Sequence, residues 1–331
     1  VPSTAERVRI ETAQAGIHQL SVAEIAAATG EDYGAVQNAF ASGAYSLTCQ
    51  GRPVAWTHIN DALVFYAEAL QTIYTDRNVY HLAPGSGPIM REEPLTTASP
   101  TGQATIFTAT EHFEERQYAP TALFSDPNDD IWVWDLLIGG HSSLGTKHYA
   151  FDLEAPAPGA ATLTVRLHGS SDAATGTDHH VQVLVNDQPV GETTWDGISA
   201  TNLTCNLANG VLASNTLTVI ALKDSGVPYS IVYLDYFTVS YPRSATGAVT
   251  LPATAGSPVE LNGFSTPPTL LDVSDPAAPV LLTYDAAASV RFTSASDSSF
   301  SAAAAFLSPA SVTPAPVNDL RATSDSVDYL V

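Results

Sequence analysis

The sequence predicts a mainly β protein. It would have a β-rich N-terminal domain with one or two short helices, a central antiparallel jelly-roll-like β-sandwich, and a small C-terminal β module. Three observations lead to this prediction. Short runs of β-branched and aromatic residues recur between turn residues at a spacing of about 8–12 residues, which is typical of sandwiches. Apolar and polar residues alternate along residues 162–168 and 181–185, as in strands with one buried face. Helix start and stop signals lie near the N-terminus.

The N-terminal domain is expected to span residues 1–125. Ser21 and Glu24 have the spacing of a capping box, and Gly30 would end the helix that they begin. A second short helix is expected over residues 33–40. The runs of strand-forming residues in this part are 7–11, 16–20, 44–49, 54–59 and 63–66. Residues 92–103 are rich in Pro, Thr and Ser and are expected to form an open connection.

The sandwich is expected to span residues 126–243 and the small β module residues 244–318. Turn residues separate the predicted strands of both parts. Residues 301–307 fit either a short helix or a strand, and residues 310–318 are expected to form a linker. The predicted strands are 149–153, 161–168, 180–185, 217–222 and 231–241 in the sandwich, and 259–261, 270–273, 280–283 and 289–292 in the module.

The charge of the chain excludes two classes of partner. Its 331 residues include 12 Lys and Arg against 34 Asp and Glu, which gives a formal net charge of −22. Such a surface cannot neutralise phosphates, so we expect no nucleic-acid binding, and anionic membranes are disfavoured for the same reason. No apolar run approaches the ~18 residues of a membrane helix. With 45% hydrophobic residues, the chain is no disordered acidic tail.

The two cysteines give no catalytic signal. Cys49 and Cys205 lie 156 positions apart in similar strand-like contexts, and they fit no metal-ligand or redox spacing. Two buried thiols are one interpretation, and a single disulfide between domains is the other. Few lysines, one methionine and a start at Val1 favour a mature extracellular protein whose signal peptide has been removed.

An acidic loop is the candidate calcium site. Asp126, Asn128 and Asp130 alternate along it, and carboxylate and amide oxygens are the ligands that Ca²⁺ prefers. The loop lacks the Gly and the distal Glu of an EF-hand. The alternative is a solvated Asx turn that precedes a strand. Calcium is the one cofactor that the sequence suggests.

Further candidate binding residues lie in the sandwich. Asp178 and His180 share one face of a predicted strand and could form a carboxylate–imidazole pair; the alternative is a hydrogen-bonded strand start. Trp195 precedes a turn, so it is the aromatic residue that we expect to be exposed and able to stack on a sugar ring; the alternative is a ring that packs in the core. Trp132 and Trp134 share a face and are expected to enter the core.

Several motifs follow one another in a set order along the chain. They are Gly16-Ile17-His18-Gln19-Leu20, Tyr74-Thr75-Asp76-Arg77-Asn78-Val79-Tyr80-His81-Leu82, His112-Phe113-Glu114-Glu115, Trp132-Val133-Trp134, Trp195-Asp196-Gly197 and Leu271-Asp272-Val273-Ser274-Asp275-Pro276. In this order they resemble the N-terminal, non-catalytic region of gingipain-type secreted cysteine peptidases. His18 and His81 stand where that family has Tyr and Trp. Asp328-Tyr329-Leu330-Val331 resembles the first strand of its caspase-like domain, so residues 319–331 would be a linker and that strand.

The resemblance implies a non-catalytic accessory region that assists folding, keeps the enzyme latent, or docks substrates or surfaces. The family's catalytic Cys and His belong to the caspase-like domain, and neither cysteine here matches them. The implied partner is the chain's own or an associated caspase-like domain, in a secreted or cell-surface setting. Arg91 has the most loop-like context among the arginines that could reach a peptidase cleft. The alternative function is an extracellular binding or assembly module that docks on glycan or on other protein subunits.

Overall fold

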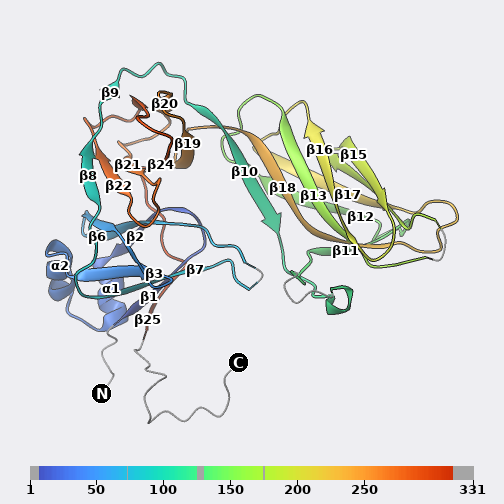
Figure 1. Cartoon of the computed structure of the whole chain (residues 1–331), viewed down its shortest axis with the longest axis horizontal. Helices are drawn as coiled ribbons and strands as arrows, with labels where there is room; N and C mark the ends of the chain where they lie inside the picture. The colour runs from blue at the N-terminus through green and yellow to red at the C-terminus, as the bar shows by residue number, and fades with distance from the viewer. Residues whose placement is uncertain (1–6, 73, 125–129, 174–175, 316–331) are drawn as a thin grey trace, which may run out of the picture. The chain divides into compact units, whose positions relative to one another are not determined.

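A computed structural model of the chain describes residues 7–72, 74–124, 130–173 and 176–315. The chain divides into two compact units. Unit 1 contains residues 1–104 and 246–331, and unit 2 contains residues 105–245 (Figure 1). Both are built mainly from antiparallel strands, which confirms the mainly β prediction. The described residues contain no helix that is long and apolar enough to cross a membrane.

Two short helices follow the second strand of unit 1. Helix α1 (Val22–Thr29) begins with the predicted capping box: Glu24 N–H donates to Ser21 Oγ at 3.2 Å, and Ser21 N–H donates to the Glu24 carboxylate at 2.8 Å. Gly30 ends the helix at φ +76°, a left-handed conformation that glycine adopts without strain. Helix α2 (Tyr33–Ala41) is capped by Asp32. The predicted helices are therefore confirmed.

The N-terminal strands of unit 1, together with β25 from the other end of the chain, form two sheets around one core. In that core Trp56 is buried, and its indole N–H donates to the Tyr45 carbonyl at 3.2 Å. The first sheet has the order β25-β1-β7-β3-β4 and the second β2-β6-β5. Their strands are β25 (Ser311–Pro314), β1 (Val8–Thr12), β7 (Asn78–Pro84), β3 (Tyr45–Cys49), β4 (Arg52–Val54), β2 (Gly16–Ser21), β6 (Ala62–Ala67) and β5 (Trp56–Ile59).

Two further sheets complete unit 1. Their orders are β19-β24-β21-β22-β8 and β20-β23-β9. The sequence of residues 301–307 fitted either helix or strand: residues 301–303 form the end of strand β24, and residues 304–307 belong to neither a helix nor a named strand. The strands are β19 (Val249–Ala253), β24 (Ser298–Ala303), β21 (Thr269–Asp272), β22 (Val280–Thr283), β8 (Arg91–Pro94), β20 (Pro258–Leu261), β23 (Val290–Thr293) and β9 (Thr97–Ala98).

A buried carboxylate binds residues 101–102, shortly before the chain passes from unit 1 into unit 2 at residue 105. Glu260 on β20 is 3% exposed and accepts hydrogen bonds from Thr101 N–H (2.9 Å), Thr101 Oγ1 (2.7 Å) and Gly102 N–H (2.6 Å). Burial raises the pKa of Glu260, but these donors outweigh burial and lower it to about 2. Residues 92–103 are thus no open connection, because they also contain β8 and β9.

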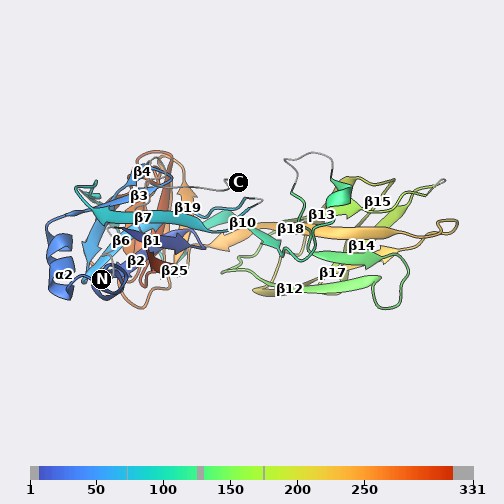
Figure 2. The same ribbon diagram turned by 90° about the horizontal axis from the view of Figure 1, so that it is seen from below.

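Unit 2 is a sandwich of two sheets (Figure 2). One has the order β10-β18-β13-β16, with β11 also paired to β18, and the other has the order β12-β17-β14-β15. The 3-10 turn η1 (Thr121–Leu123) precedes β11. The strands are β10 (Ile106–Glu114), β18 (Ile231–Ser244), β13 (Ala161–Gly169), β16 (Ala200–Leu207), β11 (Asp135–Ile138), β12 (Thr146–Asp152), β17 (Ser214–Leu222), β14 (His179–Val185) and β15 (Gln188–Trp195).

The predicted alternation places the core between these two sheets. Leu163, Val165, Val181 and Val183 are fully buried there. Trp134 packs on this core, with its ring 5.6 Å from that of Phe237 and parallel to it. Burial of each large apolar side chain stabilises the sandwich by roughly 1.5–3 kcal/mol.

The units divide the chain at other points than the sequence suggested. Strand β10, which the predicted boundary at residue 125 placed in the first domain, pairs with β18 along nine residues of unit 2. The strands that follow residue 246 belong to the same unit as the N-terminal strands. Part of the predicted linker at 310–318 is strand β25, which pairs with β1. These pairings join segments about 120 to 300 positions apart, which local patterns do not reveal.

Both cysteines are free. Cys205 is buried and Cys49 is half-buried, which agrees with two separate thiols and not with a disulfide between domains. Burial raises the pKa of both thiols.

A β-bulge shapes the outer face of the sandwich. Val165 on β13 pairs with Phe237 of β18, but Leu167 pairs with Leu234. Two residues of β18, Asp235 and Tyr236, therefore oppose the single residue Arg166. Bulges of this kind redirect side chains and often lie near functional sites.

Candidate functional site

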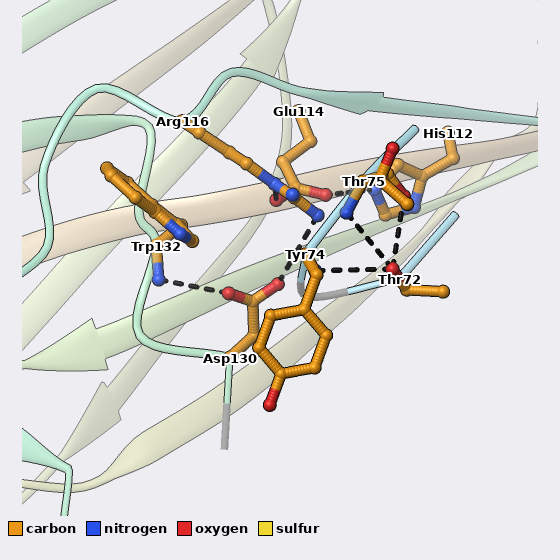
Figure 3. A network of polar contacts seen from close by, with 8 residues as sticks. All are labelled: Thr72, Tyr74, Thr75, His112, Glu114, Arg116, Asp130 and Trp132. Atoms are coloured by element: carbon orange, nitrogen blue, oxygen red, sulfur yellow. Dashed lines mark hydrogen bonds and ion pairs between the residues drawn. The ribbon is translucent and has the colours of Figure 1, made fainter. Parts of the chain in front are cut away.

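A network of charged side chains, which we call the outer-face network, lies beside this bulge (Figure 3). It consists of His112, Glu114, Arg116, Asp130, Arg166 and Asp235, of which Figure 3 shows the first four. His112 and Glu114 are two residues apart on β10, so they project from the same face of the sheet. His112 Nε2 lies 3.1 Å from Glu114 Oε2, and Arg116 Nε donates to Glu114 Oε1 at 3.4 Å. The Glu114 side chain is 9% exposed.

Two further ion pairs extend the network. Arg116 Nη2 lies 3.9 Å from Asp130 Oδ2, and Arg166 Nε lies 3.9 Å from Asp235 Oδ2. The His112 ring packs on that of Tyr236, with 4.7 Å between the ring centres. The bulge thus brings an acidic and an aromatic residue of β18 next to one arginine of β13.

The network shifts the pKa values of its two most buried carboxyl groups, those of Glu114 and Asp235, in opposite directions. The hydrogen bond with His112 lowers the pKa of Glu114; burial opposes this shift and Arg116 supports it. Burial, and after it the negative charge of Glu114, raise the pKa of Asp235 to about 7 against the opposing charge of Arg166. Asp235 therefore exchanges a proton near neutral pH, while Glu114 stays ionised.

The candidate calcium loop is described only in part. Asp126 and Asn128 lie outside the described residues. Asp130 Oδ1 accepts a hydrogen bond from Trp132 N–H at 3.0 Å, which is the contact of an Asx turn, and its other oxygen faces Arg116. Across the part of the chain that the structure describes, no group of three or more His, Cys, Asp or Glu residues is placed to hold a metal ion.

Asp178 and His180 do not pair with each other. Asp178 is 2% exposed, and its two oxygens accept hydrogen bonds from Ala173 N–H (3.0 Å) and Gly197 N–H (3.1 Å). His180 Nδ1 lies 3.0 Å from the Asp224 carboxylate instead, and its Nε2 lies 3.7 Å from Glu192. Opposite ring nitrogens face these two acids, so the three side chains do not share one point for a ligand.

The buried histidine between them has a structural role. His179 is fully buried; its Nε2 lies 3.1 Å from the Ser171 carbonyl and 3.2 Å from the Gly197 carbonyl, and its Nδ1 lies 3.0 Å from Ser230 Oγ. With a proton on Nε2, the ring donates to the carbonyls and accepts from the serine. His179 and Asp178 together tie the loops at this end of the sandwich.

The other two predicted binding residues lie in different units. Trp195 is half-buried: its ring packs 4.8 Å from that of His179, and its indole N–H donates to the Ser199 carbonyl at 3.2 Å. Arg91 lies on β8 in unit 1, with a 71% exposed side chain, and forms an ion pair with Glu93 at 2.9 Å. Arg91 is thus on an edge strand rather than on the predicted loop.

Sequence reasoning missed Asp235, Glu114 and Arg166 as site residues. The spacing of His112 and Glu114 could have shown that they share a face. No local signal marks Asp235, because its position depends on a bulge that forms between strands about 70 residues apart.

Neither the protein-family models nor the curated proteins include a match to this chain. Among solved structures, the crystal structure of dimeric latent PorU from Porphyromonas gingivalis matches with a TM-score of 0.69 at 13% sequence identity. The match covers 93% of this chain and 33% of the PorU chain. The fold of this chain is therefore similar to that of a region of PorU, and the chain spans a third of that protein's length.

Two carbohydrate-binding modules are weaker matches. One is the CBM36-1 domain of a multidomain xylanase from the hindgut metagenome of Trinervitermes trinervoides, with a TM-score of 0.25 and 16% identity over 41% of this chain and 96% of the module. The other is a CBM36 module in complex with calcium and xylotriose, with a TM-score of 0.26 and 18% identity over 39% of this chain and 97% of the module. Likenesses at these TM-scores carry no argument about function.

Proposed function

We propose that this chain is a non-catalytic accessory region of a secreted, gingipain-like cysteine peptidase of the PorU type. The observation that carries the proposal is the match of both units to one region of PorU, over 93% of this chain. A region that accompanies a peptidase would assist its folding, keep it latent, or dock substrates. Its partner would be the peptidase domain of the same or an associated polypeptide, and its setting would be extracellular or the cell surface.

The order of the sequence motifs supports the proposal independently of the fold. Motifs from both units occur in the order that the gingipain-type N-terminal region shows, from Gly16 to Pro276. The segment that resembles the first strand of the caspase-like domain, residues 328–331, lies outside the described residues. It remains part of the proposal.

The chemistry of the cysteines and of the buried serine also supports an accessory role. Because burial raises the pKa of Cys49 and Cys205, neither thiol is activated as a nucleophile. Ser230 lies beside His179, but both are fully buried, so a substrate cannot reach the pair.

The proposal is tested by mixing the purified chain with the separately purified peptidase domain of the same polypeptide. Size-exclusion chromatography with light scattering measures complex formation, and a peptide substrate measures activity. We expect a one-to-one complex and a change in activity or in the yield of refolded enzyme. If both proteins are folded and neither a complex nor an effect is seen at about 50 μM, the accessory role is wrong.

A second candidate function is an extracellular binding or assembly module. The observation that favours it is the outer face of the sheet β10-β18-β13-β16, where strand register aligns neutral polar side chains. One row contains Thr110, Ser240, Thr162 and Asn206, and the next contains Thr238, Thr164 and Thr204. Glycan-array binding that is lost in Thr164→Val but kept in Trp195→Ala would support a sugar-binding face. Regular filaments seen by microscopy would support assembly.

A further inference from the structure

Two neighbouring hollows lie on the C-terminal strands of unit 1. The first has a volume of about 440 Å³, and its lining includes Pro88, Ile89, Arg91, Asp272 and Asp275. The second has a volume of about 480 Å³, and its lining includes Pro252, Thr254, Asp297 and Ser299. Both are also lined by Ser274, so we call the pair the Ser274 groove.

Hydrogen bonds fix the loop that separates the hollows. Ser274 N–H and Oγ both donate to Asp272 Oδ1, at 2.9 and 2.6 Å. Ser299 N–H donates to Ser274 Oγ at 3.1 Å, and Ala55 N–H donates to the Ala277 carbonyl at 2.8 Å. The loop is thus bonded to strand β24 on one side and to the residue before β5 on the other, so little conformational freedom remains to be lost when a ligand binds.

The three carboxylates of the groove are bound in the same way. Asp272 Oδ1 accepts from Ser274, Asp275 Oδ1 accepts from Ala277 N–H at 3.1 Å, and Asp297 Oδ1 accepts from Ala255 N–H at 2.9 Å. Within the described residues, the second oxygen of each accepts no hydrogen bond from the protein. Each carboxylate thus retains an acceptor and its negative charge for a ligand.

An apolar strip accompanies these charges. Ile89 is 49% exposed, although its backbone is held by a β-bridge to Trp56. Pro88 and Pro279 lie in the same lining. The methylene stem of a lysine or arginine side chain packs on such a strip while its charged end reaches a carboxylate.

Charge selects the class of ligand. The lining contains three carboxylates and one guanidinium, and that guanidinium, of Arg91, is already paired with Glu93. The chain as a whole has a net charge of −22. A cationic partner is therefore attracted both by the groove and by the field of the whole protein.

Addition of a strand to the neighbouring edge is disfavoured. Strand β8 is the edge of its sheet and all four of its residues are exposed. Leu95 N–H donates to the Thr283 carbonyl, toward the interior of the sheet. Because backbone groups alternate in direction along a strand, the backbone of the preceding residue, Pro94, faces the free edge. Proline has no N–H to donate to an added strand. A peptide that binds in this region is therefore expected in the groove rather than along the free edge of β8.

We propose that the Ser274 groove binds an extended, lysine- or arginine-bearing peptide segment of a partner protein. One basic side chain lies along Pro88 and Ile89 with its charge at Asp272 and Asp275, and a second reaches Asp297. This inference goes beyond the proposed function and does not require the partner to be a peptidase.

Fluorescence anisotropy tests the inference with a fluorescein-labelled pentapeptide, acetyl-Ala-Lys-Ala-Arg-Ala-amide, and its counterpart with glutamate at both charged positions. We expect binding of the basic peptide in the range of about 10 μM to 1 mM, weakened by added NaCl, and no binding of the acidic one. Asp275→Asn and Asp297→Asn keep the Oδ1 acceptor and remove the charge, so each should weaken binding about three- to five-fold.

Ile89→Ser should weaken binding by a similar factor, since it removes the apolar strip. Asp152→Asn, an exposed change on β12 of unit 2, is the matched control and should leave binding unchanged. Circular dichroism of each variant confirms that it folds. Equal binding of both peptides, no binding at 1 mM, or an equal loss in the Asp152 control would overturn the inference. Failure here leaves the complex with a peptidase domain to be judged by its own assay.

Discussion

Replacement of Asp235 by asparagine should remove a pH-dependent destabilisation of unit 2, namely the cost of ionising a buried carboxyl group. The Asp235 side chain is 18% exposed and lies near Glu114 and Asp130 as well as near Arg166. In the folded protein its pKa is about 7, against an ordinary value of 3.8. The folded state thus binds more protons than the unfolded state between about pH 4 and pH 7. Stability therefore falls as the pH rises through this window and is level above it, so far as this group is concerned.

The magnitude follows from the size of the pKa rise. About three pKa units correspond to a ceiling of roughly 4 kcal/mol at pH 8, at ~1.36 kcal/mol per unit. Screening by water and the loss of the partner of Arg166, which contributes less than about 1 kcal/mol, reduce the expected gain. We expect Asp235→Asn to stabilise unit 2 by about 2 kcal/mol at pH 8 and to have little effect at pH 4.5.

Urea unfolding at pH 4.5, 6 and 8 measures this difference. Tryptophan fluorescence is a suitable signal because Trp132, Trp134 and Trp195 all lie in unit 2. Comparison with the wild-type chain at each pH cancels the contributions of the other titrating groups, and Asp152→Asn serves as the control. If the difference between Asp235→Asn and wild type is the same at every pH, or if the variant is less stable at pH 8, the reasoning is refuted.

Three further predictions concern other parts of the fold. Gly169→Ala should lower the stability of unit 2 by about 2 kcal/mol or more in urea unfolding, because a Cβ there would lie 2.5 Å from His179 Nε2; an unchanged midpoint would contradict the packing. Ser21→Ala should cost unit 1 about 1 kcal/mol in thermal unfolding, and Ser21→Asp should recover most of it. Glu260→Gln should raise the pH at which half of unit 1 is unfolded in an acid titration. The native carboxylate, with a pKa of about 2, stabilises the fold above pH 4.5 and loses this effect only as the pH falls toward 2. Equal midpoint pH values for the variant and the wild type would show that the negative charge of Glu260 does not strengthen its hydrogen bonds from Thr101.

Local patterns in the sequence were enough to predict the helices and the sandwich strands β12, β13, β14, β17 and β18. The capping box of Ser21 and Glu24 involves residues three apart, and the alternation along residues 162–168 reflects the two faces of one strand. Both signals depend only on neighbouring residues, so they survive without knowledge of the rest of the fold.

Structure that depends on distant partners was missed. Strand β8 has the sequence Arg-Glu-Glu-Pro and no apolar face; it is a strand because β22 pairs with it in parallel. Strand β25 likewise depends on β1, about 300 residues earlier. Asp235 entered the outer-face network only through the bulge opposite Arg166.

The candidate sites show the same division. The pattern of Asp178 and His180 correctly placed both side chains near the start of a strand, but the backbone N–H of Gly197 and the carboxylate of Asp224 proved to be their partners. That Asp126 and Asn128 bind calcium stays a prediction, and so do the binding roles of Trp195 and Arg91. Sequence spacing shows which side chains share a face, whereas loops from elsewhere in the chain decide what those side chains contact.

The most direct test of the accessory role is to isolate the natural polypeptide with an antibody against unit 2. Its intact mass and the peptides that follow residue 331 are then measured. The account predicts a larger polypeptide with a caspase-like domain that contains a catalytic Cys and His, or a processed chain that co-purifies with such a domain. A polypeptide of 331 residues that carries no peptidase domain and co-purifies with none would contradict it.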